Sequence, residues 1–308
     1  MRLIAIAVIV LICAGLAWLF WPWPPSPPEI AQAGDPERGE YVLRMGGCVS
    51  CHTEDEEDGG AFLAGGRALQ SPFGTFYASN ITPDPETGIG GWSTGEFVLA
   101  ATRGTSPAGH PYFPAFPYTS YTRMTLQDLV DLKAYLDTVQ PVSKEVPAHE
   151  LDFPFGFRPL LEGWKLLFFE PGTFEPDPSR SDAWNRGAYV VNGPGHCGEC
   201  HTPRNVLGAR QEDRFLAGTP SGPDGKPVPN ITPHEDGIGG WSKSDISFAL
   251  LTGILPDGDV LGGLMAEAIE ESTSHLERAD LDAIAEYLLS LPPLSDGEPV
   301  GEQASPTE

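Results

Sequence analysis

Two pentapeptides, Cys48-Val49-Ser50-Cys51-His52 and Cys197-Gly198-Glu199-Cys200-His201, share the pattern CxxCH. This is the spacing of a c-type haem attachment site, in which two cysteine sulfurs form thioethers with the haem vinyl groups and the next histidine ligates the iron. Two intervening residues let both sulfurs reach one porphyrin, and the histidine then lies under the ring as the proximal ligand. The sequence therefore predicts two covalently bound haem c groups, with Cys48, Cys51, Cys197 and Cys200 as attachment residues and His52 and His201 as iron ligands.

Other uses of these cysteines fit the pattern less well. A zinc site would place its two CxxC pairs about 15 to 20 residues apart, whereas Cys48 and Cys197 stand 149 positions apart. A thioredoxin-like redox pair needs neither a histidine after the second cysteine nor a second copy. Structural disulfides remain an alternative in an oxidising compartment, although two intervening residues would close an unusually tight loop.

The two motifs belong to a longer internal repeat. Three segments recur around them: Arg38–Leu43 as Arg186–Val191, Phe62–Gly65 as Phe215–Gly218, and Asn80–Ser93 as Asn230–Ser242. The offset between the copies stays between 148 and 153 throughout. Such self-similarity indicates that one haem-binding domain occurs twice in tandem.

Helices are expected before and after each haem motif. Asp35-Pro36 offers an N-cap and a first-turn proline for a helix that leads into the first motif, and Ser181 caps its counterpart. Each copy closes with an amphipathic helix, capped at Thr125 in the first copy and at Ser274 in the second. The apolar faces of these closing helices are Leu129, Leu132, Tyr135 and Leu136, and Leu281, Ile284, Tyr287 and Leu288. The predicted fold is mainly α, with two tandem haem domains, long irregular loops and an N-terminal transmembrane helix.

The amino terminus has the length and composition of a membrane span. Leu3 to Trp21 contains 19 residues and no charged side chain, and as a helix it would extend about 28 Å, close to the hydrocarbon thickness of a bilayer. Arg2 precedes this run and Arg38 is the next basic residue, so the positive-inside rule places the haem domains in the periplasm. We expect an uncleaved single-pass anchor in the inner membrane, with cleavage after Ala17 as the alternative.

The charge balance restricts the partners. The net charge is −25, from 43 acidic and 18 basic residues, which argues against nucleic acid and against charge-driven binding to anionic lipid. A redox protein partner would therefore offer a basic docking face. The expected organisation is an anchor at 1–23, a proline-rich linker at 24–34, haem domains at 35–142 and 181–294, an inter-domain segment at 143–180 and a disordered acidic tail at 295–308.

The residue on the other side of each iron decides between an electron carrier and a catalyst. A methionine thioether opposite histidine raises the reduction potential and closes the iron, which suits electron transfer. Met124 follows a proline-containing loop, and Met265 begins a short helix after two glycines. Their separations along the chain from His52 and His201 are comparable, and we predict both methionines as sixth ligands.

Other side chains compete for these roles. Met45 lies only three residues before the first motif, too close to cross the ring, and is expected in the core. His110 and His234 are the alternative sixth ligands. Arg67 and Arg204 are candidates for pairing with haem propionates, although a solvated surface is the more usual place for an arginine.

Four strings are similar to those of a known family: NITPDPETGIGGW at 80–92, PAFPYTSYTRMT at 114–125, RGAYVV at 186–191 and HCGECHTPRN at 196–205. The chain resembles the cytochrome c subunit of membrane-bound alcohol and gluconate dehydrogenases and its diheme relatives over almost everything from residue 35 to residue 293. The resemblance implies two cytochrome c domains, with haem ligated by His52 with Met124 and by His201 with Met265. Those subunits usually carry three haem motifs, whereas this chain has two.

The sequence therefore predicts a membrane-tethered diheme c-type cytochrome that passes single electrons between periplasmic or membrane redox partners in a respiratory chain. A dehydrogenase, an oxidase or a soluble cytochrome would be the partner, and the chain itself would not be an enzyme. The alternative is a diheme peroxidase, which needs one iron open to peroxide and an acid–base group beside it.

Overall fold

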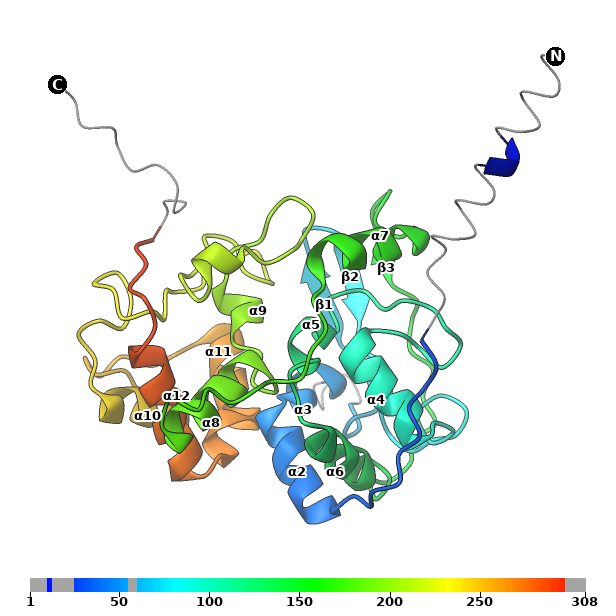
Figure 1. Cartoon of the computed structure of the whole chain (residues 1–308), viewed down its shortest axis with the longest axis horizontal. Helices are drawn as coiled ribbons and strands as arrows, with labels where there is room; N and C mark the ends of the chain where they lie inside the picture. Colours follow the sequence, from blue (N-terminus) through cyan, green and yellow to red (C-terminus); the bar gives the residue numbers. More distant parts are fainter. Residues whose placement is uncertain (1–9, 13–24, 55–59, 297–308) are drawn as a thin grey trace.

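The computed structural model describes residues 10–12, 25–54 and 60–296. Two groups of helices lie side by side (Figure 1), which we call the first half (35–142) and the second half (181–294). The first half contains α2 (Pro36–Met45), α3 (Cys48–His52), β1 (Ala68–Ser71), β2 (Gly74–Tyr77), α4 (Thr94–Arg103), α5 (Tyr118–Tyr121) and α6 (Leu126–Leu136). The mainly α-helical fold class is confirmed.

The second half repeats much of this order after a connecting segment. The connection holds β3 (Glu150–Leu151) and α7 (Pro159–Phe168). The second half contains α8 (Asp182–Asn192), α9 (Gly198–His201), the 3-10 turn η2 (Glu212–Arg214), α10 (Lys243–Thr252), α11 (Gly263–Glu271), the 3-10 turn η3 (Thr273–His275) and α12 (Arg278–Leu289).

The predicted membrane anchor lies outside the described residues, apart from positions 10–12. Within the described ranges, no helix is long and apolar enough to cross a bilayer. Most of the predicted disordered tail, from residue 297 onward, also falls outside them.

Three of the four predicted helix caps are confirmed. The side chains of Asp35, Ser181 and Thr125 each accept a hydrogen bond from a backbone amide in the first turn of the helix that follows. The cap predicted at Ser274 is wrong, because that residue lies in η3 and α12 begins three residues later than expected, after Glu277. The amide of Glu277 instead donates to the hydroxyl of Tyr41, 3.0 Å away. A tertiary contact thus replaces the local cap.

The first and last helices of each half cross at a glycine. A Cβ atom on Gly39 of α2 would lie 2.0 Å from the carbonyl oxygen of Asp131 in α6, and one on Gly187 of α8 would lie 2.0 Å from that of Ala283 in α12. Only glycine permits backbones to approach this closely. The predicted apolar faces of α6 and α12 are buried at these crossings, with Tyr135 the least enclosed member.

A small antiparallel sheet adds an element that the sequence patterns did not indicate. β1 pairs with β2, and β2 pairs with β3 from the connecting segment, through Gly74 opposite Leu151 and Thr75 opposite Glu150. Leu161 of α7 packs with Phe76 of β2 and with Phe113. Strands of four and two residues carry too little alternation to be recognised in a sequence.

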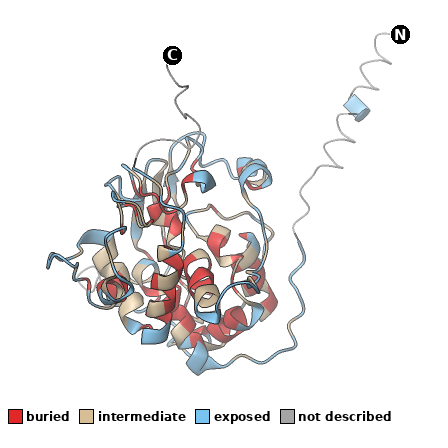
Figure 2. Cartoon of the chain, turned by 60° about the vertical axis from the view of Figure 1, so that its left-hand side comes forward, coloured by how far each residue is buried: buried red, intermediate tan, exposed pale blue. Residues whose placement is uncertain are grey.

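One continuous apolar core joins the two halves. It includes Val42 and Leu129 from the first half and Val190 and Leu281 from the second. Buried residues gather on the sides of the helices that face the interior (Figure 2).

Two equivalent polar contacts cross between the halves beside this core. In one, Arg38 pairs with Asp128 of its own half at 2.9 Å, and Asp128 also accepts the hydroxyl of Tyr189 from the second half. The tyrosine oxygen in turn accepts the amide of Thr125 at 3.2 Å. The arginine, the aspartate and the tyrosine therefore form a shared contact that spans both halves.

The second contact reverses the roles of the halves. Arg186 pairs with Asp280 at 2.6 Å, and Tyr41 of the first half donates to Asp280 at 2.7 Å. Burial alone would raise the pKa of Asp280, but the hydrogen bonds from Arg186 and Tyr41 outweigh burial and leave this pKa below its usual value. The folded protein therefore stabilises the ionised carboxylate.

The crossing at Gly187 predicts a steric effect. Gly187→Ala should lower the free energy of unfolding by about 1–3 kcal/mol, since the new methyl group meets backbone that cannot move aside. Gly163→Ala in α7 is the control, because its Cβ atom would meet no heavy atom within 4 Å. Guanidinium denaturation of both variants measures the difference, and equal stabilities would contradict the close crossing.

The Asp280 contact predicts acid sensitivity. Because the pKa of Asp280 is lowered in the folded state, its stabilising effect is complete above the usual value of 3.8 and is lost as the pH falls through the lower folded value. Asp280→Asn should cost about 1–3 kcal/mol at neutral pH and should flatten the loss of stability in acid. Unfolding between pH 2 and pH 6 tests this, with the exposed Glu235→Gln as control. An unchanged acid slope would contradict it.

Candidate functional site

The first CxxCH motif forms a short helix directly after α2. Gly47, between α2 and α3, has φ of 59°, a left-handed conformation that glycine adopts without strain. The helix α3 then carries Cys48, Cys51 and His52 within two turns.

A backbone carbonyl orients each motif histidine. Nδ1 of His52 lies 2.7 Å from the carbonyl oxygen of Ser79, and Nδ1 of His201 lies 2.8 Å from that of Pro229. A carbonyl oxygen only accepts, so each Nδ1 carries the proton and each Nε2 keeps its lone pair for a metal. Burial lowers the pKa of both histidines, which favours the neutral imidazole that ligates iron.

The loop after each motif also has the same geometry in both halves. Leu63 and Leu216 both adopt positive φ, 60° and 63°, which is rare for residues other than glycine. Their amides donate to the hydroxyls of Thr53 and Thr202 at 3.1 and 3.0 Å. The repeat thus preserves backbone conformation as well as sequence at the two sites.

The four motif cysteines, Cys48, Cys51, Cys197 and Cys200, are free thiols in the structure. Burial raises the pKa of Cys48 and of Cys197 to about 12. The disulfide alternative is not realised, and both sulfurs of each motif remain available for thioether formation.

The residues present fit a haem at each motif. Among the described residues, no cluster of three or more histidine, cysteine, aspartate or glutamate side chains could hold a metal ion by itself. A haem brings four nitrogen ligands of its own, so the protein need supply only axial ligands and points of attachment. One oriented imidazole and two free thiols per motif match that requirement.

The two predicted methionine ligands lie in different surroundings. Met124 is 2% exposed and lies in the common core between α5 and α6. Met265 is half-buried in the first turn of α11. Met45 lies in the core, as expected. Of the competing histidines, His110 is exposed and Nδ1 of His234 lies 3.1 Å from Asp236.

The helix that carries Met265 lies against the first haem motif. Arg67 donates to the carbonyl of Ser50 inside that motif and pairs with Glu267 of α11. Arg44, at the end of α2, pairs with Glu271 of α11 at 2.8 Å. Arg204 pairs with Glu199 at 2.5 Å. Both arginines that were considered for haem propionates thus hold carboxylates of the protein.

Sequence reasoning missed the part played by Glu199, one of the two variable residues of the second motif. Although burial opposes ionisation of Glu199, Arg210 and Arg204, with Ser120 and Thr119, lower its pKa to about 2. A glutamate between the cysteines next to two downstream arginines was the available signal. This signal did not identify the role of Glu199, because the CxxCH spacing does not restrict the two residues between the cysteines.

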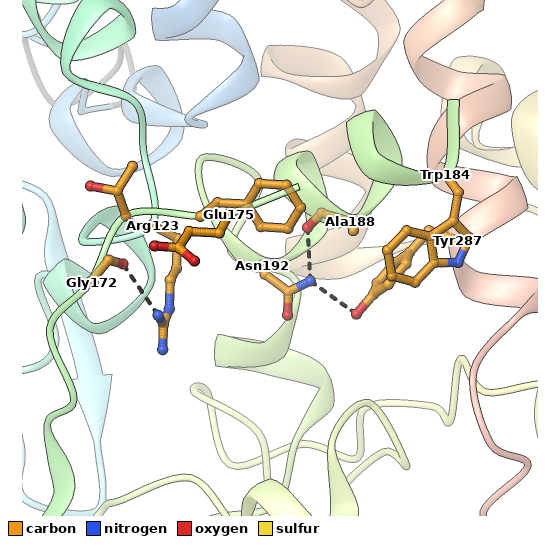
Figure 3. A pocket seen from close by; sticks show the side chains of 9 residues that line it. Arg123, Gly172, Glu175, Trp184, Ala188, Asn192 and Tyr287 are labelled. Carbon is orange, nitrogen blue, oxygen red and sulfur yellow. Dashed lines mark hydrogen bonds between the residues drawn. The ribbon is translucent and has the colours of Figure 1, made fainter. Parts of the chain in front are cut away.

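A cavity of about 510 Å³ is lined by residues other than those predicted to bind haem, although one of them, Arg123, precedes Met124. Its lining includes Arg123, Gly172, Asn192 and Tyr287 (Figure 3). Arg123 donates to the carbonyl of Gly172 at 3.2 Å, and Asn192 donates to the hydroxyl of Tyr287 at 2.9 Å. The first bond joins the first half to the connecting segment, and the second joins α8 to α12. The residues that line this cavity therefore have structural roles.

Comparison with known proteins gives several relatives, although no protein-family model matches the chain. A diheme cytochrome c-type protein of Cereibacter sphaeroides is 44% identical over 292 residues, which are 93% of this chain and 96% of that protein. The cytochrome c subunit of the alcohol dehydrogenase (quinone) of Gluconobacter oxydans is 38% identical over 88% of this chain. The gluconate 2-dehydrogenase cytochrome c subunit of Pantoea cypripedii is 36% identical over 83%.

The lengths of these relatives differ. This chain spans nearly the whole of the diheme protein but only 58% and 59% of the alcohol and gluconate dehydrogenase subunits. The resemblance read from the sequence strings is confirmed by all three.

Proposed function

The chain belongs to the family of diheme c-type cytochromes and dehydrogenase cytochrome c subunits, and on this premise we propose that it carries single electrons between redox partners at the periplasmic face of the inner membrane. Like its diheme relative, this chain binds two covalently attached haem c groups. The observation that carries the proposal is the duplicated histidine geometry: in both halves a carbonyl fixes Nδ1 and leaves Nε2 for iron.

We assign one haem to each motif. Cys48, Cys51 and His52 hold the first haem, and Cys197, Cys200 and His201 hold the second. When bound, each haem supplies an iron that changes by one electron. The chain's own contribution is to fix the imidazole through Ser79 and Pro229, and to exclude water with the apolar core that both halves share.

The sixth ligands are Met124 for the first haem and Met265 for the second. Burial of Met124 among apolar side chains fits a thioether ligand that keeps water and peroxide from the iron. Closed irons support a carrier and disfavour the peroxidase alternative.

The proposed setting is a tethered one. The apolar run at residues 3–21 would anchor the chain, and the proline-rich linker would hold the haem domains away from the bilayer. Two of the three named relatives are dehydrogenase subunits, which supports a dehydrogenase as the electron donor. The excess negative charge of the chain would be met by basic residues on that partner.

The haem assignment predicts a stoichiometry. The double variant Cys48→Ser/Cys51→Ser should contain one haem per chain instead of two, because only the second motif can still form thioethers. A pyridine haemochrome assay measures this, and Cys13→Ser, the variant at the remaining cysteine, should keep two. Two covalent haems in the double variant would exclude the first motif.

The methionine assignment predicts the state of the iron. The unsubstituted reduced protein should bind no carbon monoxide, and Met124→Leu should bind one molecule per chain, because leucine cannot ligate iron. In the ferric state, Met124→Leu should show half of the methionine-to-iron charge-transfer absorbance of the unsubstituted protein. Met45→Leu is the control, since Met45 is equally buried. Carbon monoxide binding by the unsubstituted protein would favour the peroxidase.

A further inference from the structure

Glu199 joins the two halves from inside the second haem motif. Its carboxylate is buried, and its position between Cys197 and Cys200 places it in the attachment segment itself. Arg204 and Arg210 of the same half donate to it at 2.5 and 3.0 Å. These two bonds hold the carboxylate in place within the second half.

The other two donors to this carboxylate come from the first half. The hydroxyls of Thr119 and Ser120, both in α5, donate to the same Glu199 oxygen at 2.8 and 2.7 Å. Arg210 also donates to the Ser120 hydroxyl at 3.0 Å. The short helix α5 is therefore bound to the second haem motif by a cluster of charged and hydroxyl groups around the buried Glu199 carboxylate.

The same helix leads directly to Met124. The amide of Arg123 donates to the carbonyl of Ser120 at 2.9 Å, and the amide of Met124 donates to that of Tyr121 at 3.0 Å. These two backbone hydrogen bonds fix the position of Met124 relative to α5. A displacement of α5 would displace the sulfur as well.

The helix α5 is also bound to the segment just before the first haem motif. The hydroxyl of Tyr121 donates to the carbonyl of Gly46 at 2.9 Å. Nε2 of His196, the residue before Cys197, lies 3.2 Å from the same oxygen. One carbonyl beside the first motif therefore receives groups from α5 and from the start of the second motif.

We propose that Glu199 is a positioning residue for the first haem site: from within the second haem motif it holds α5, and through α5 it holds Met124 over the first iron. This inference rests on the proposed ligation of the first haem by Met124. As a consequence, a residue of the second half, which carries the second haem, determines the axial ligation of the first haem. The two haem sites are then structurally coupled.

The test uses the full-length, haem-loaded protein and the variant Glu199→Ala. Removal of the carboxylate releases Thr119 and Ser120. Glu199→Ala should still contain two haems per chain. In the reduced variant, the shifted methyl NMR resonance of Met124 should be lost, and the carbon monoxide bound per chain should rise from zero to one. The Met265 resonance should persist. The two methyl signals are assigned by their absence in Met124→Leu and Met265→Leu.

Two variants separate positioning from a general effect of lost charge. Glu199→Gln keeps an oxygen acceptor for Thr119 and Ser120 and should retain the Met124 resonance. Glu212 is the other carboxylate paired with Arg210, at 3.0 Å, and its side chain is 63% exposed. Glu212→Ala should therefore leave both methionines ligated. If Glu199→Ala does not fold, the pair Thr119→Val/Ser120→Ala in the first half removes the same bonds and should give the same loss.

The possible failures are distinct. Absence of the Met124 resonance from the unsubstituted protein would overturn the ligation itself, and with it the proposed function of Met124. If that resonance is present there and unchanged in Glu199→Ala, or if only the Met265 signal changes, the positioning role is overturned while the ligation stands.

Discussion

The carboxylates of Asp128 and Asp280 hold the molecule together, because each binds the arginine of its own half and the tyrosine hydroxyl of the other. A buried charge that loses its hydrogen-bond partner destabilises the folded protein. Two such contacts, related by the internal repeat, fix both the separation and the rotation of the halves. The close helix crossings at Gly39 and Gly187 place the aspartates where the tyrosines can reach them.

The two halves also contact each other at the haem motifs. The α11 helix of the second half lies against the first motif through Arg67 and Glu267, and α5 of the first half is bound to the second motif through Glu199. Each half thus supports the other's motif. The segments that carry the two motifs are therefore each bound by residues of both halves.

Several elements could be predicted because their signals are local. The caps at Asp35, Ser181 and Thr125 depend on one side chain and the next turn of backbone. The cap at Ser274 failed for the opposite reason: its pattern is local, but the amide it would satisfy is bound by Tyr41, more than 200 positions away along the chain. The sheet was missed because β1 and β2 have only four residues each and β3 only two, and because β3 comes from the connecting segment, far from β2 along the chain.

The sequence by itself determined the chemistry of this protein. The spacing of Cys48, Cys51 and His52 and its repetition specify covalent haem, and the recurrence of Arg38–Leu43 and Asn80–Ser93 at offsets near 150 indicates two copies of one fold. Only the tertiary structure decided how those copies meet. Which carbonyl orients His52, and which hydroxyls reach Glu199, depends on groups that lie far apart in the chain and come together only when the shared core forms.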